Sequence, residues 1–304
     1  TGHRRGLEHV EYAIPIFLGS EAEAAEAAKA LMEEDSRVSG LLDGTYTQRM
    51  DEWDRAALLE DAIETSQGIN RDGFRLYKAG SQGALVAAAQ AMDSLNVSDA
   101  TKGIYLGHVN ELWGWIPEGE QASLLDPDLC LTPNLNAMCG LFMGTLFVRE
   151  EQWAKAGAMV EAFRAETRRR LADDPEEDVE LWEESARFII AYEDLHRGNL
   201  RAAGPVFREM NTRADALGGR ARIALGEWEA AQGHTDEAIR HYQASLHGYQ
   251  RPRAVLELAR LHESAGRTAE ALEYWNRLLV TTRSGDQDLP QVVEAKEAVA
   301  RLTQ

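Results

Sequence analysis

Toward its C-terminus, the chain repeats a glycine, an alanine and an aromatic residue at constant offsets. The three sets are Gly198, Ala203 and Phe207; Gly233, Ala238 and Tyr242; and Gly266, Ala271 and Trp275. Successive glycines are 35 and 33 residues apart. A fixed period of this length is typical of repeat proteins, in which each unit buries its apolar face against its neighbours. The repeat therefore predicts an all-α chain of stacked helix pairs.

The physical logic can be followed in one unit. The first helix is predicted around 220–229, where small and apolar residues fall at helical spacing: Ala221, Ala224, Leu225 and Trp228. Gly233 then occupies a helix end, where a positive φ costs glycine nothing. Thr235 is predicted to be the N-cap of a second helix, and Asp236 and Glu237 suit its first turn because the helix dipole favours negative charge there. Ala238 and Tyr242 would then lie on the buried face.

This unit resembles the tetratricopeptide repeat family. The resemblance is carried by Leu225-Gly226, Ala238 and Tyr242, with Pro252 at the start of the next unit. The following unit offers Leu258-Ala259, Gly266, Ala271 and Trp275, and the preceding one offers Ile190-Ala191, Gly198, Ala203 and Phe207. The chain departs from the family at the first-helix tryptophan, which is replaced by Arg187, Arg222 and Val255. The resemblance covers 184–280 and implies a right-handed superhelical solenoid of antiparallel helix hairpins.

The rest of the chain carries a weaker form of the same pattern. Residues 137–165 repeat the offsets, with Glu151 in place of the turn glycine. We predict degenerate hairpins over 1–170, including helices at 22–34 and 51–63, with irregular loops at about 96–136. We predict repeats over 171–304, at about 184–215, 219–250 and 252–284, followed by a capping helix at 290–302.

Composition limits the classes of partner. The 304 residues carry a formal net charge of −19 at pH 7. Binding to nucleic acid requires Lys and Arg to neutralise phosphates, so we expect no nucleic-acid partner. The run Arg168-Arg169-Arg170 is interpreted as an exposed helix end. No apolar stretch approaches the roughly 20 residues that span a bilayer, so no membrane span is expected.

Further sequence features bear on cellular setting. Cys130 and Cys139 are nine residues apart, and we favour two small buried residues over a disulfide. Arginine outnumbers lysine 27 to 5, a bias that we associate with high-GC bacterial genomes. The chain begins with Thr1 and shows no signal-like segment, so we expect a fragment, a processed form or the ordered part of a longer protein, located in the cytoplasm.

Motifs for catalysis are not found in the sequence. It contains no phosphate-binding GxxxxGK[ST] loop, no HExxH and no Cys/His spacing typical of a metal site. Asp126-Pro127-Asp128 is interpreted as a turn rather than a pair of catalytic acids. Trp113 and Trp115 are interpreted as core residues. We therefore expect no catalytic residue, no metal and no cofactor.

The resemblance implies a partner-binding face instead. In such solenoids the first helices line a concave groove that receives a peptide or protein segment. The corresponding residues here are Ser185, Phe188, Tyr192, Arg220, Ile223, Glu227, Arg253, Leu256 and Arg260. Arg220, Arg253 and Arg260 are predicted to form a basic stripe suited to an acidic or C-terminal segment. The alternative is that these arginines are solvated or pair with neighbouring Glu and Asp.

The sequence thus favours a non-catalytic scaffold or regulatory module that binds a protein or peptide. On this hypothesis, removing the three arginines would weaken binding and leave stability almost unchanged. One alternative is the sensor region of a larger bacterial signalling protein, such as a kinase or a transcriptional activator. Another is an enzyme with a site at 96–140, because long loops often carry function.

Overall fold

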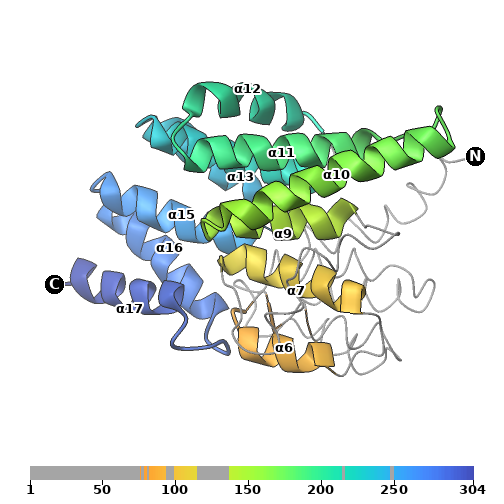
Figure 1. The fold of residues 1–304 in the computed structure, drawn as a ribbon. Coiled ribbons are helices and arrows are strands. Elements are labelled where there is room, and N and C mark those ends of the chain that lie inside the picture. The colour runs from red at the N-terminus through yellow and green to blue at the C-terminus, as the bar shows by residue number, and fades with distance from the viewer. Residues whose placement is uncertain are drawn as a thin grey trace, which may run out of the picture.

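The structure is a computed structural model that describes residues 76, 79–80, 82–93, 99–114, 137–213, 216–246 and 250–304. Within them every regular element is a helix, which confirms the all-α prediction for this part of the chain (Figure 1). The helices are α6 (Leu85–Asp93), α7 (Asp99–Trp113), α9 (Ala137–Arg149), α10 (Trp153–Asp173), α11 (Glu180–His196), α12 (Leu200–Met210), α13 (Ala216–Ala231), α14 (Thr235–Ser245), α15 (Arg251–Ser264), α16 (Thr268–Thr281) and α17 (Pro290–Leu302). The helices expected at 22–34 and 51–63 lie outside the described residues.

Four helix pairs, from α9–α10 to α15–α16, are joined by turns of one geometry. The central residue of each turn has a positive φ: Glu151 (54°), Gly198 (79°), Gly233 (79°) and Gly266 (71°). The residue after it donates its N–H to a carbonyl five positions earlier, as His234 does to Glu229 over 3.0 Å. This is the Schellman motif, which satisfies the last carbonyls of the first helix. The repeating glycine therefore has a backbone cause, and Glu151 takes the same conformation without being glycine.

The same turn occurs earlier in the chain, at Gly83. Its φ is 71°, and the next residue, Ala84, donates its N–H to the Ala79 carbonyl over 2.8 Å. Ala88 and Met92 follow at the offsets of the repeat, and both are fully buried. The repeating pattern therefore includes a unit that the sequence analysis missed, because methionine stands where the later units have an aromatic residue.

The predicted packing residues are buried. Ala203, Ala238 and Ala271 have no exposed surface, and the aromatic residues that follow them are buried as well. Gly226 allows α13 to lie close to α14, because a Cβ at this position would lie 2.7 Å from the Tyr242 ring. The close approach of α13 and α14 therefore requires a residue without a side chain at this point.

Three expectations need correction. Thr235 is the first residue of α14 and not its N-cap, which is His234. The His234 ring does not cap the helix but forms a hydrogen bond with Glu229 over 2.7 Å. Residues 99–113, expected to be irregular, form α7, and the part of that segment at 115–136 lies outside the described residues. Cys139 is disulfide-bonded rather than a free buried thiol.

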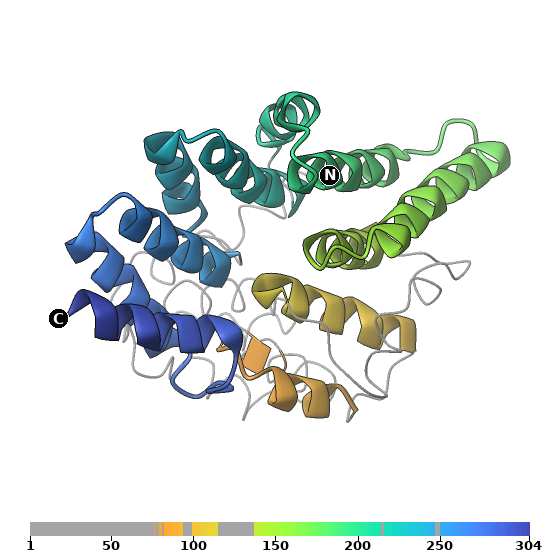
Figure 2. The ribbon, with the colours of Figure 1, turned by 60° about the vertical axis from the view of Figure 1, so that its left-hand side comes forward.

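Successive helices pack along a curved row (Figure 2). First helices contact each other, α9 with α11 and α11 with α13, and each second helix packs on the next first helix. On the inside of the curve, α7 packs against α9 and contacts α15. Figure 2 shows α6 close to the connection between α16 and α17.

The two ends of the described chain are joined by hydrogen bonds. Asp286, between α16 and α17, donates its N–H to the Gly83 carbonyl over 3.1 Å. Its carboxylate accepts the Val86 N–H at the start of α6 over 3.0 Å. Gln291 of α17 donates to the carbonyl of Trp113, at the end of α7, over 2.5 Å. The curved row therefore closes on itself through its first and last described helices.

Candidate functional site

The nine residues predicted to line a groove lie on α11, α13 and α15, but most of them are not accessible. Seven are buried: Ser185, Phe188, Tyr192, Arg220, Ile223, Arg253 and Leu256. Only Glu227 and Arg260 are partly exposed. The expectation of an open basic stripe is therefore wrong for Arg220 and Arg253.

Arg220 is held by α7. Its Nε and Nη2 bond the two carboxylate oxygens of Glu111 over 3.0 and 2.7 Å, and both side chains are almost fully buried. Thr145 of α9 also donates to Glu111, over 3.0 Å. The Arg220 guanidinium lies over the Phe142 ring, 4.4 Å from its centroid. At this end, the predicted binding face is thus covered by a helix of the same chain.

Arg260 is held at the other end by α17. Its Nε and Nη2 bond Glu294 over 2.8 and 2.6 Å, and its Nη1 bonds Glu257 over 3.1 Å. The stripe arginines thus pair within the chain, which is the alternative that the sequence left open.

Two of the predicted residues, Glu227 and Arg253, line a cavity between these two ends, and Tyr192 contacts Arg253. Arg253 Nη2 donates to the Tyr192 hydroxyl over 2.8 Å and forms an ion pair with Glu227. The cavity has a volume of about 370 Å³ and is named here the inner cavity. It is lined by Arg149, Leu195, His196, Glu227, Arg253 and Glu257.

Arg149 comes from the end of α9 and was not identified from the sequence. Its Nη1 donates to the Glu111 carbonyl over 2.5 Å, in the last turn of α7. Gly114, with a φ of 57°, follows α7 directly, and a Cβ there would lie 2.8 Å from the Arg149 guanidinium. Glycine thus allows the guanidinium to lie against the end of α7, where the helix dipole favours a positive charge.

Burial and the charges of neighbouring side chains determine the ionisation of the residues around the inner cavity. Burial lowers the pKa of Arg149, and the nearby Arg253 lowers it further. Burial would raise the pKa of Glu227, but Arg253, His196 and Arg149 outweigh it and the pKa lies below its ordinary value. Burial lowers the pKa of His196, with contributions from the two arginines, and raises the pKa of Tyr192. At neutral pH, Glu227 is therefore charged, and His196 and Tyr192 are neutral.

Two polar atoms at the inner cavity have no hydrogen-bond partner among the residues that the structure describes. They are Glu227 Oε2 and Arg253 Nε, and both are buried. The His196 Nε2 atom lies 3.9 Å from Glu227 Oε2, beyond hydrogen-bond distance. A buried carboxylate oxygen without a donor is costly, and such atoms mark places that a polar ligand can complete.

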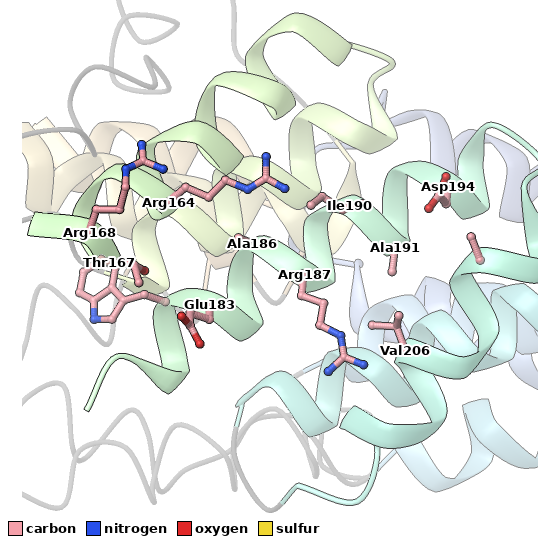
Figure 3. A pocket seen from close by; sticks show the side chains of 12 residues that line it. Arg164, Thr167, Arg168, Glu183, Ala186, Arg187, Ile190, Ala191, Asp194 and Val206 are labelled. Atoms are coloured by element: carbon pink, nitrogen blue, oxygen red, sulfur yellow. The ribbon is translucent and has the colours of Figure 1, made fainter. Parts of the chain in front are cut away.

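A second concave surface lies over α11, between α10 and α12 (Figure 3). It has a volume of about 450 Å³ and is named here the outer groove. Its floor is apolar and includes Trp182, Ala186, Ile190, Ala191, Ala202 and Val206. Figure 3 shows Arg164 and Arg168 of α10 on one side of the groove and Arg187 and Val206 on the other. Glu183, Asp194 and Thr167 complete the lining.

The outer groove leaves apolar and basic groups available. Ile190 is 37 % exposed and lies on the apolar floor of the groove. Arg168 makes no hydrogen bond or ion pair with any part of the described chain, whereas Arg164 pairs with Glu161 over 2.8 Å. The hydroxyl of Thr167 is buried and has no hydrogen-bond partner among the described residues. The sequence analysis assigned Ile190 to the repeat pattern, so its exposure was not foreseen.

Side-chain contacts near the α10–α11 connection hold one end of the outer groove in place. Glu166 is buried near the end of α10 and binds Arg169 and Arg170 over 2.7 to 2.8 Å. Arg170 also lies over the Trp182 ring, 4.5 Å from its centroid. These contacts fix one end of the groove. They also show that two arginines of the run at 168–170 are paired, and only Arg168 is left for an external partner.

None of the described helices combines the length and apolarity that crossing a membrane requires. Asp126, Asp128 and Trp115 lie outside the described residues. No protein-family profile matches the sequence, and no curated protein sequence is significantly similar to it.

Proposed function

We propose that the chain is a solenoid of tetratricopeptide-like hairpins that acts as a non-catalytic interaction module. The recurring turn geometry from Gly83 to Gly266 and the contacts between successive first helices support this architecture. The partner is a protein or peptide, and it binds in the outer groove. The observation that carries this proposal is the exposed Ile190 on an apolar floor edged by arginines.

The outer groove is favoured over the face that the sequence predicted. On that face α7 binds Arg220 and α17 binds Arg260, so a peptide would have to displace a helix of the same chain. In the outer groove, no described helix covers Ile190. A segment could therefore dock there without any rearrangement of the described helices.

The charges of the outer groove indicate the chemistry of the segment. Arg164 and Arg168 lie on the α10 side, while Glu183 and Asp194 lie on the α11 side. A segment with apolar anchors over Ile190 and acidic side chains toward α10 matches this arrangement. In a chain with a net charge of −19, this local basic edge would counter the general repulsion of an acidic partner.

The test is selection of short peptides from a random displayed library on the intact chain, followed by calorimetry. The selected peptides should combine apolar anchors with acidic residues. Ile190→Gln and Arg168→Glu should each weaken binding by about tenfold or more, which corresponds to about 1.4 kcal/mol. Arg240→Glu, on the exposed face of α14, is the matched control and should bind as the wild type does. Selected peptides that bind both groove variants with wild-type affinity would refute the proposal.

A further inference from the structure

We propose that the inner cavity binds a small zwitterion of the α-amino-acid class, with its carboxylate on Arg149 and its ammonium group on Glu227. This site is separate from the outer groove and does not depend on it. The inner cavity draws its residues from α9, α11, α13 and α15, whereas the outer groove draws on α10, α11 and α12.

Arg149 would bind the carboxylate of the ligand. This side chain lines the inner cavity and is largely enclosed, yet no carboxylate of the described chain lies within ion-pair distance of it. Within the described chain its one hydrogen bond runs from Nη1 to the Glu111 carbonyl, and Nε and Nη2 have no hydrogen-bond partner there. A guanidinium with two free donors on one edge is suited to bidentate binding of a carboxylate.

Glu227 would bind the ammonium group of the ligand. Its Oε1 is taken by Arg253, while its Oε2 is buried without a donor. Glu257 also lines the cavity and adds a second negative charge beside it. An ammonium group offers three donors to such oxygens and would satisfy the unpaired atom. The apolar Leu195 provides a wall against which the side chain of the ligand can pack.

Charge balance and size favour a zwitterion over other small ligands. The lining contains two arginines and two glutamates, and its histidine is neutral at neutral pH. A phosphate or a simple carboxylate would add net negative charge to this partly buried site, and a simple amine would add net positive charge, each with an electrostatic penalty. A molecule with one charge of each sign keeps the balance, and a volume of about 370 Å³ accommodates one of amino-acid size.

The experiment is a thermal-shift and calorimetric screen of the intact chain with the proteinogenic α-amino acids, at concentrations up to about 10 mM. At least one amino acid should raise the melting temperature and give saturable binding. Its N-acetyl derivative lacks the ammonium group and its amide lacks the carboxylate, so each should bind about tenfold more weakly or worse. Saturation by none of the amino acids, or equal binding of either derivative, would overturn the proposal.

Variants locate the site. Arg149→Gln and Glu227→Gln should each weaken binding of the selected amino acid by about tenfold or more. Arg164→Gln, in the outer groove, should leave binding unchanged. Because Arg149 also contacts the end of α7, circular dichroism must show that its variant is folded. If Arg149→Gln unfolds, the nearly isosteric Glu227→Gln carries the test, and wild-type affinity in that variant would refute the site.

Discussion

Gly226 and Gly219 lie in the same helix, α13, but differ in what surrounds them. A Cβ at Gly226 would lie 2.7 Å from the buried Tyr242 ring, whereas a Cβ at Gly219 would meet no atom within 4 Å. Gly226→Ala should therefore destabilise the chain by about 1 to 3 kcal/mol through overpacking. Gly219→Ala should be neutral or stabilise by up to about 1 kcal/mol through helix propensity. Urea unfolding measures both, and equal effects would contradict the packing of α13 on α14.

His262 is a buried residue whose protonation should destabilise the fold. Its ring stacks on Tyr274, with centroids 5.4 Å apart, and neither ring nitrogen has a hydrogen-bond partner in the described part of the chain. Burial lowers its pKa, Arg267 lowers it further, and Glu270 and Glu273 oppose the shift. The folded-state pKa thus lies below the unfolded value of about 6.5, so protons bind preferentially to the unfolded chain and stability falls as the pH drops through this range.

The matched variant is His262→Phe, which keeps an aromatic ring and cannot be protonated. Its stability relative to the wild type should increase as the pH falls from 7 to 5. Unfolding free energies of both proteins at the two pH values provide the measurement. Parallel pH profiles would show that His262 is not the group that titrates.

At the scale of helices, a buried ion pair joins α7 to α13. The side chains of Glu111 and Arg220 are both almost fully buried. Removing one of them would leave the charge of the other buried and unpaired. Arg220→Ala should therefore cost about 3 to 5 kcal/mol. Arg260→Ala removes a pair whose side chains are 40 % and 38 % exposed, so it should cost no more than about 1 kcal/mol. Similar losses of stability in the two variants would contradict the buried position of Arg220.

The repeat offsets could be predicted from the sequence, whereas the ion pair between Glu111 and Arg220 could not. The offsets that place Ala238 and Tyr242 in the core are local, because a helix and a tight turn fix them, and the structure confirms their burial. The partner of Arg220 is 109 residues away, and no local period identifies it. The sequence therefore located the helices that carry Tyr192, Glu227 and Arg253, but not α7, which covers part of their face. Exposure of Ile190 likewise depends on the spacing between α10 and α12, which only the packed structure reveals.

At the scale of the whole molecule, the last connection of the chain supports the first described helices. The segment between α16 and α17 forms hydrogen bonds with Gly83 and Val86. Helix α17 forms a hydrogen bond with the end of α7 through Gln291. A Cβ at Gly285 would lie 2.2 Å from the Gln82 carbonyl oxygen, so the approach is close. Most solenoid repeats contact only their neighbours. Here the stability of α6 and α7 should instead depend on residues near the C-terminus.

Asp286 tests this dependence, because its carboxylate caps the first turn of α6 from 200 residues away. Asp286→Ala removes the acceptor of the Val86 N–H and should cost about 0.5 to 2 kcal/mol, as the loss of an N-cap does. Amide hydrogen exchange should accelerate in α6 and α7 while α13 and α14 keep their protection, since local opening exposes only the segment that loses its support. Asp288→Ala is the control, because the Asp288 side chain is exposed and forms no hydrogen bond or ion pair within the described chain. Unchanged exchange in α6 of the Asp286 variant would mean that the two ends fold independently.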